Sequence, residues 1–137
     1  MNKELLKAYT ETDFNVFELS ITIKIGEHNG LLNNLLFEQG FEKWAYITPF
    51  NPYSKVLTVE QNEDRLKDLR NKIANYKYFE GEGVGKDPSW KPEKSFLILV
   101  ITKERAIELG NEYEQNAIVY GEINELPELL WLQLKCV

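Results

Sequence analysis

The stretch WAYITPFNPYS, residues 44–54, joins an apolar segment to a polar loop, and the chain is organised around it. Trp44 to Thr48 predict a short buried strand. Pro49 and Pro52 each fix φ and remove a backbone donor, so regular structure should stop there, and Thr48 and Asn51 should be extended. Rigid polar loops that leave buried strands often carry function. The loop is therefore a candidate site, and the alternative is a plain connection whose side chains bond their own backbone.

The composition is that of one ordinary domain. The chain has 137 residues, 43% of them hydrophobic and 12% aromatic, which can form a core without disulfides or a metal. Its charge of −6 makes binding to a nucleic-acid backbone unfavourable, whereas a small ligand or a basic protein partner fits. No stretch has the length of a membrane span or of a signal peptide core. Cys136 is the only cysteine and is poorly placed for a nucleophile, and a cytoplasmic location is expected.

The first third of the chain predicts a helix, a strand and a second helix. Residues 3–9 suit a short helix within an N-terminal arm, residues 1–14. Apolar and polar side chains alternate strictly in residues 17–25, which predicts a long strand with one covered face. Leucines at helical spacing predict a helix that ends at Gly40. His28 lacks a second histidine or a cysteine nearby, so it is interpreted as a surface or capping residue, and no metal or cofactor is predicted.

A charged helix is predicted to follow the polar loop. Thr58 and Gln61 have the spacing of a capping box, which marks its start. Asn62 and Arg65 lie beside the leucine stripe of this helix and near its first turn. Both are expected to lean toward the protein at the end nearest the loop, and the alternative is a solvated or capping role.

Three glycines interrupt the next segment, and residues 81–89 predict a flexible loop or lid. A phosphate-binding loop needs four residues between its first glycine and the Gly-Lys pair, followed by Ser or Thr. Here only three residues separate Gly81 from Gly85, and Asp87 follows Lys86. The glycines therefore do not indicate nucleotide phosphates.

The run FLILVI, residues 96–101, predicts a central strand buried on both faces. Glu93 stands just ahead of it, at the edge of the core, where partial burial would raise the pKa of its carboxyl. Glu93 is thus a candidate acid or base, and the alternative is a structural partner for Arg65.

The last third predicts a helix from Thr102 to about Tyr113, a buried strand at residues 117–120 and a closing strand. Leu130, Leu132 and Leu134 alternate with polar or aromatic residues in that closing strand. The predicted fold class is α+β, with a single domain over residues 1–137. Its sheet is expected to be mainly antiparallel, with a mixed sheet as the alternative, and to have about five or six strands and helices mostly on one face.

The polar segments should meet if the strand at Trp44 runs antiparallel to those at Phe96 and Ala117. Its C-terminal end then lies beside their N-terminal ends, and four distant segments share one rim of the sheet. Glu93 and Arg65 are the candidate catalytic residues of this rim. The candidate ligand-binding residues are Thr48, Asn51, Tyr53, Ser54, Asn62, Arg65, Trp90, Ser95, Gln115 and Asn116.

Four ordered motifs carry a family resemblance. They are Ile-Thr-Pro-Phe-Asn-Pro-Tyr-Ser at 47–54, Gln-Asn-x-x-x-Leu at 61–66, Trp-x-Pro-Glu-x-Ser-Phe at 90–96 and Gln-Asn-Ala-Ile-Val-Tyr-Gly at 115–121. From about Phe17 to Gly121 the chain resembles the bacterial family catalogued as domain of unknown function number three-two-nine-three. That family more often has Ala at the position of Pro49 and often Trp at that of Phe50, which implies a stiffer loop here and a smaller aromatic contact. The resemblance implies a shared domain and no particular activity.

Three functions remain open from the sequence. In the first, the rim binds a small polar or nucleotide-like ligand, with Tyr53 or Trp90 stacking on it; amides do not titrate, which favours recognition over chemistry. In the second, the protein is a metal-free hydrolase or transferase in which Glu93 is the general base and Arg65 stabilises negative charge. In the third, it is an inhibitor-type or immunity-type module whose acidic helix docks a basic protein.

Overall fold

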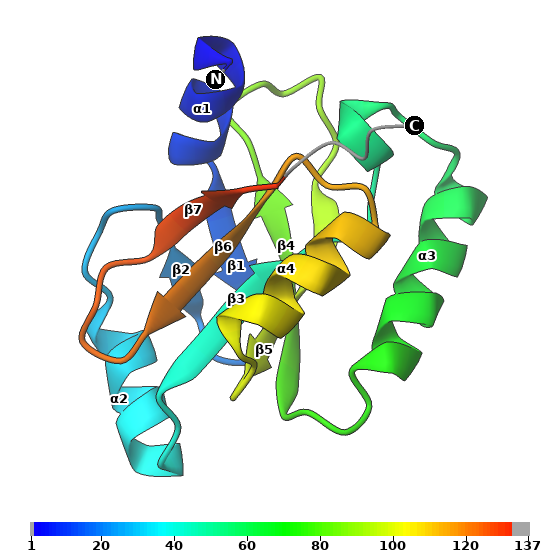
Figure 1. Cartoon of the computed structure of the whole chain (residues 1–137). Helices are drawn as coiled ribbons and strands as arrows, with labels where there is room; N and C mark the ends of the chain where they lie inside the picture. Colours follow the sequence, from blue (N-terminus) through cyan, green and yellow to red (C-terminus); the bar gives the residue numbers. More distant parts are fainter. Residues whose placement is uncertain (1, 133–137) are drawn as a thin grey trace.

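The computed structural model describes residues 2–132, which form a curled antiparallel sheet of seven strands together with four α-helices (Figure 1). The strands are β1 (Asp13–Val16), β2 (Ile21–Ile23), β3 (Lys43–Ile47), β4 (Tyr78–Val84), β5 (Glu93–Leu99), β6 (Ala117–Glu122) and β7 (Glu128–Trp131). The helices are α1 (Lys3–Thr10), α2 (Gly30–Gln39), α3 (Val59–Lys72) and α4 (Lys103–Glu112), with one 3₁₀ turn, η1 (Pro52–Ser54). The α+β class and the antiparallel sheet are confirmed, with more strands than expected.

The order of the strands is β2-β1-β4-β5-β3-β6-β7, and every neighbouring pair is antiparallel. Strand β3, which leads into the polar loop, lies between β5 and β6. Tyr46 is paired with Leu97 on one side and with Val119 on the other. The C-terminal end of β3 therefore lies beside the N-terminal ends of β5 and β6, as the rim hypothesis requires.

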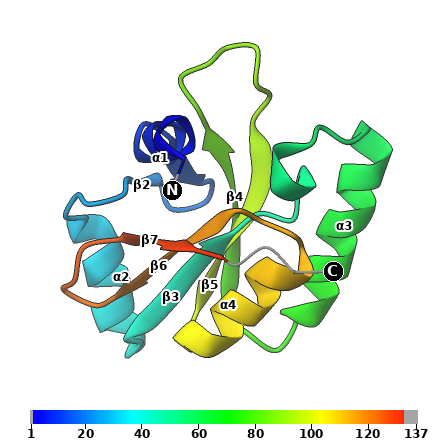
Figure 2. The ribbon, with the colours of Figure 1, turned by 45° about the horizontal axis from the view of Figure 1, so that its top comes forward.

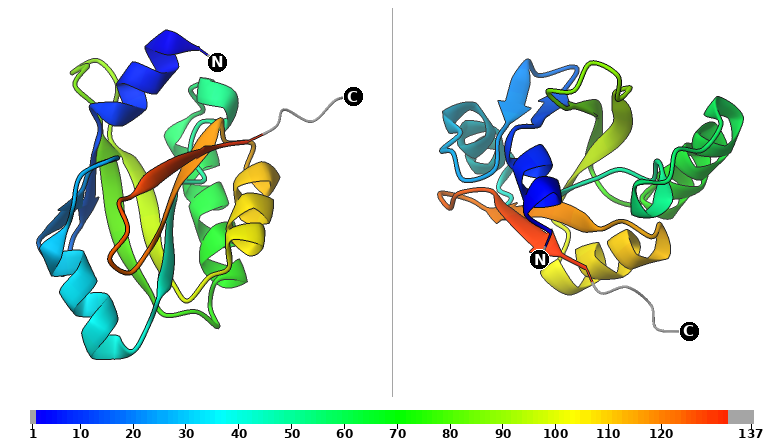
Figure 3. Two further views of the ribbon diagram at one scale, coloured as in Figure 1. Left: turned by 60° about the vertical axis from the view of Figure 1, so that its left-hand side comes forward. Right: turned by 90° about the horizontal axis from the view of Figure 1, so that it is seen from above.

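Helices cover both faces of the sheet, so the prediction of helices mostly on one face is wrong. Leucines of α3 and α4 pack on the face that carries Ile47, Phe96 and Ile118. Leu32 and Leu36 of α2 pack on the opposite face, with Trp44, Tyr46, Leu97, Leu99 and Val119. Because β3, β5 and β6 are apolar at nearly every position, both of their faces need cover. Seen from above, the sheet curls around α1 (Figure 3, right).

The long strand predicted over residues 17–25 is wrong. The chain forms a hairpin instead, in which Phe14 pairs with Ile23 and Val16 with Ile21 across a turn at residues 17–20. Ser20 has a left-handed backbone in that turn, with φ of 52°. The hairpin places the four apolar residues of β1 and β2 in the core, whereas Phe17 is 55% exposed. The alternation in the sequence continued across a turn that lacks glycine and proline.

The glycine-rich loop begins later than predicted, because β4 continues through Val84. Gly81 lies inside β4, paired with Val16 and Ser95 on the two neighbouring strands. A Cβ on Gly81 would lie 1.9 Å from the carbonyl oxygen of Asn15, so glycine allows the close approach of β1. Figure 2 shows β4 and β5 projecting as a hairpin whose loop stands beside α1.

The helix ends follow the sequence signals. Thr58 and Gln61 form the predicted capping box at the start of α3, and Thr102 caps α4. Gly40 ends α2 in the left-handed conformation, with φ of 73°. Strand β7 ends at Trp131, and Leu132 is the last residue described. The predicted continuation of this strand to Leu134 lies outside the described residues, as does Cys136. Among residues 2–132 no helix is long and apolar enough to cross a membrane.

Candidate ligand site at the rim of the sheet

A cavity of about 550 Å³ lies between α1 and the face of the sheet that α2 covers further down. Its volume is in the range of small-molecule sites in proteins. Phe14, Tyr46 and Val119 of the sheet line it, and Leu5 and Tyr9 line it from α1. Eight of the residues predicted at the rim also line it: Thr48, Asn51, Ser54, Trp90, Glu93, Ser95, Gln115 and Asn116.

The loop that enters the cavity has an unusual backbone. Asn51, Tyr53 and Ser54 all adopt left-handed conformations, with φ of 51°, 48° and 63°. The prediction that Asn51 is extended before Pro52 is therefore wrong. A non-glycine residue in this conformation costs about 1–2 kcal/mol, which contacts with the surrounding protein must offset. The loop must therefore be held by contacts outside itself.

Asn62 supplies one of these contacts from the first turns of α3. Its side-chain oxygen accepts the backbone N–H of Asn51 at 3.0 Å, and its amide nitrogen donates to Asn51 Oδ1 at 2.9 Å. The same Oδ1 accepts the backbone N–H of Leu57 at 3.0 Å. With Oδ1 occupied by two donors, the Asn51 amide is fixed so that Nδ2 points to the Glu93 carboxylate, at 2.7 Å.

Glu93 begins β5 and is partly buried at the cavity edge. Burial raises the pKa of its carboxyl above the usual value, and hydrogen bonds from Asn51 and Trp90 partly oppose this rise. The predicted alternative, in which Glu93 pairs with Arg65, is wrong. Glu93 receives neutral donors in place of a guanidinium, so its charge is not balanced by a cation of the rim.

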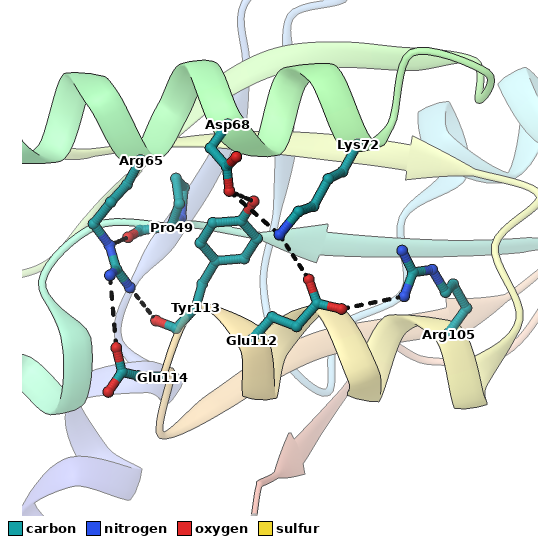
Figure 4. A network of polar contacts seen from close by, with 8 residues as sticks. All are labelled: Pro49, Arg65, Asp68, Lys72, Arg105, Glu112, Tyr113 and Glu114. Atoms are coloured by element: carbon teal, nitrogen blue, oxygen red, sulfur yellow. Dashed lines mark hydrogen bonds and ion pairs between the residues drawn. The ribbon is translucent and has the colours of Figure 1, made fainter.

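Arg65 acts as a clamp between the loop and the end of α4 (Figure 4). Its Nε donates to the Pro49 carbonyl at 2.6 Å, and a second guanidinium nitrogen donates to the Tyr113 carbonyl. The guanidinium also lies 3.7 Å from the Glu114 carboxylate. Arg65, Asn62 and Tyr53 do not line the cavity. These three predicted residues therefore lie beside the rim without facing the cavity.

The clamp continues into a polar network between α3 and α4 (Figure 4). The Tyr113 hydroxyl donates to Asp68 at 2.6 Å, and Lys72 lies 3.3 Å from Asp68 and 2.9 Å from Glu112. Hydrogen bonding to Tyr113 lowers the pKa of Asp68, and that to Lys72 lowers the pKa of Glu112. Burial raises the pKa of Tyr113 to about 12. This network joins α3 to the end of α4 and lies outside the cavity.

The other rim side chains mostly hold the rim together. Gln115 donates to the Phe50 and Tyr113 carbonyls, at 2.9 and 3.1 Å. Asn116 donates to Ser54 Oγ at 2.9 Å. Thr48 and Ser95 donate to backbone carbonyls at 2.8 and 2.9 Å. Every buried side-chain polar atom in the described part of the chain has a hydrogen-bond partner.

Two tyrosines of the cavity were missed at the sequence level. Burial and the nearby charge of Glu93 raise the pKa of Tyr9 to about 12, against hydrogen bonds with Asn116 and the Ala117 backbone. The Tyr46 hydroxyl donates to the Asn15 carbonyl at 2.7 Å, and burial raises its pKa. The helical spacing of Leu5, Ala8 and Tyr9 in α1 was a signal for an inward face, but it did not say what that face covers.

The described residues contain no cluster of side chains suited to bind a metal ion. In residues 2–132 no three His, Cys, Asp or Glu side chains are grouped so that they could hold an ion. His28 is exposed ahead of α2. The cavity lining offers the partly buried Glu93 carboxylate, several hydroxyls and amides, aromatic surface, and the charged side chains Glu4, Lys7, Glu11, Lys86 and Asp87.

Comparison with known proteins gives a family. No curated protein and no solved structure matches the chain. The model of one family, described as Protein of unknown function (DUF3293), matches residues 47–118. This span is shorter than the expected resemblance, and it runs from the end of β3 through the polar loop, Glu93 and the first residues of β6. Because the match covers more than half of the chain, the protein belongs to the family of unknown function DUF3293.

Proposed function

We propose that the protein binds a small polar ligand in the cavity between α1 and the rim of the sheet. The observation that supports this most strongly is the convergence on one cavity of about 550 Å³. Its rim comes from the loop after β3, the start of β5 and the start of β6, and its roof comes from α1. Segments so far apart in the chain supply hydroxyls, amides and a carboxylate around an apolar floor. Small-ligand sites have this composition.

Hydrogen bonds within the protein also hold the rim in place. Asn62 and Arg65 hold the left-handed loop residues, and Asn51 in turn fixes one oxygen of Glu93. Affinity is lost when a site must order its side chains on binding. A loop that keeps three strained residues in place therefore favours recognition.

The test is a thermal-shift screen against amines, amino acids, sugars and nucleosides, because a ligand that binds only the folded state raises its melting temperature. Hits are repeated on Ala8→Trp, which places a large ring in the cavity from α1, and on Lys3→Trp, which lies on the same helix outside the cavity lining. We expect Ala8→Trp to abolish the shift and Lys3→Trp to retain it. Equal shifts in both variants, or no hit with any class, would contradict the proposal.

A second candidate is acid–base catalysis by Glu93 on the bound molecule. Its support is the partial burial of the carboxyl inside the cavity, which raises its pKa toward the range useful for proton transfer at neutral pH. Arg65 would not assist, since its guanidinium is bound to Pro49 and Tyr113. Glu93→Gln should stop turnover of a substrate identified in the screen while the substrate still binds. Unchanged turnover in this variant would exclude Glu93 as the base.

A further inference from the structure

The groups that contact Glu93 indicate what kind of ligand the cavity binds. The carboxylate accepts hydrogen bonds from Asn51 Nδ2, at 2.7 Å, and from the Trp90 side chain, and it forms no ion pair with any residue between 2 and 132. Taking a carboxylate partly out of water is unfavourable unless a cation or strong donors replace the water. Asn51 cannot turn to offer more, because Leu57 and Asn62 occupy its oxygen. Within residues 2–132 the carboxylate therefore has two neutral donors and no cationic partner.

The lining as a whole has more acidic than basic side chains. Among residues 2–132 it contains two lysines, Lys7 and Lys86, and four carboxylates, which are Glu93 itself, Glu4, Glu11 and Asp87. Arg65 does not line the cavity, because its guanidinium donates to the carbonyls of Pro49 and Tyr113. Phosphate and carboxylate groups are usually held by arginine forks or by several N–H donors. The excess of carboxylates over lysines in the lining therefore disfavours a ligand whose only charged group is anionic.

Aromatic and aliphatic surface makes up the remaining wall. Phe14 and Tyr46 stack edge to face on the floor, with ring centroids 5.3 Å apart. Tyr9 and Leu5 line the roof, and Trp90 lies at the edge next to Glu93. Such surfaces bury the apolar body of a ligand, and aromatic rings attract cations over their faces.

We propose that the cavity takes a small organic cation, a primary ammonium or amidinium on an apolar body, with the cationic nitrogen at the Glu93 carboxylate. This inference rests on the proposed function and narrows it. It removes phosphate-bearing nucleotides from the ligand classes that the rim alone would allow. The carboxylate gives the cation a charge-assisted hydrogen bond, and the rings and aliphatic side chains cover the body.

Three probes of nearly equal shape test the charge preference: phenethylamine, phenethyl alcohol and phenylacetate. Each is titrated into the protein by NMR or calorimetry. We expect the amine to bind at least tenfold more tightly than the alcohol, and phenylacetate to bind most weakly. Equal binding of amine and alcohol, or a preference for phenylacetate, would overturn the cation inference and leave ligand binding in the cavity intact.

Variants separate the site from the general attraction of an acidic protein for amines. Glu93→Gln keeps an oxygen for Asn51 and should bring the amine-to-alcohol ratio close to one. Glu38 is exposed on α2, so Glu38→Gln makes the same change in net charge away from the cavity and should leave the ratio unchanged. Ala8→Trp should weaken all three probes. If Glu38→Gln and Glu93→Gln act alike, the preference is not local and the inference is wrong. If no probe binds, the inference also fails, whereas the proposed function fails only if the broader screen has no hit that Ala8→Trp weakens.

Discussion

Replacing Asn62 by alanine should lower the free energy of unfolding by about 2–4 kcal/mol, although the residue lies on a helix that alanine favours. Asn62 makes two hydrogen bonds to Asn51, at 3.0 and 2.9 Å. Without it the Asn51 N–H, in a residue only 9% exposed, keeps no partner, which costs about 1–3 kcal/mol. Loss of the second bond adds about 1 kcal/mol. The left-handed conformation of Asn51 then also loses the contact that fixes it.

The assay is equilibrium unfolding in urea followed by tryptophan fluorescence, with Asn71→Ala as the matched control. Asn71 is exposed on the same helix, so both variants gain the same helix propensity and only one loses the contacts to Asn51. Asn62→Asp sharpens the test, because aspartate can accept from the Asn51 N–H but cannot donate to Asn51 Oδ1. It should be at least as destabilising as alanine at pH 7. Agreement of Asn62→Ala with Asn71→Ala to within about 0.5 kcal/mol would refute the reasoning.

Four further substitutions, one of them a control, test other parts of the structure. Arg65→Ala removes two hydrogen bonds from a charged donor and should cost about 3 kcal/mol in urea unfolding; a lost affinity for a cavity ligand with unchanged stability would restore Arg65 to the site. Gly81→Ala should cost at least about 3 kcal/mol, because its Cβ would lie 1.9 Å from the Asn15 carbonyl oxygen. Gly83→Ala in the same strand has its nearest contact at 3.7 Å and should be close to neutral by the same measurement. Because folding raises the pKa of Glu93, the native state loses stability as pH rises from the unfolded value of 4.5 through the folded pKa. Glu93→Gln lacks this loss, so its melting temperature at pH 7 should be at least that of the parent, and the difference should shrink toward pH 4. If the variant is less stable relative to the parent at pH 7 than at pH 4, the predicted direction of the pH dependence is wrong.

Part of the fold could be predicted because the apolar runs are long. β3, β5 and β6 are apolar at successive positions, and strands of that kind belong in the middle of a sheet with both faces covered. The same apolar runs also require helices on both faces of the sheet, because each of the two apolar faces needs cover. The hairpin of β1 and β2 could not be read in this way. Its turn at residues 17–20 continues the period of two and contains no turn residue stronger than Ser20.

Gly81 and Asn51 were misread for a related reason, namely that tertiary contacts decided their conformation. Glycines in succession usually indicate a loop, but Gly81 is needed inside β4 where the Asn15 backbone approaches. A residue before proline is usually extended, but Asn51 is left-handed and bonded to Asn62 and Glu93. The roof of the cavity was missed because the position of α1 depends on contacts such as that of Tyr9 with Trp131, whose rings meet edge to face at 5.9 Å.

The sequence placed scaffold residues and ligand-facing residues in one set, because both are polar and both stand at the same rim. Their partners distinguish them. Asn62 and Arg65 have their donors filled by the protein, and their removal should lower stability. Glu93 is partly buried without a cation, and its neutralisation should not lower stability at pH 7. Residues selected for binding are often those that folding alone would not choose. The sign of the stability change therefore assigns each rim residue to one group or the other, and a loss of stability in Glu93→Gln comparable to that in Asn62→Ala would place Glu93 in the scaffold and remove the basis for a cationic ligand.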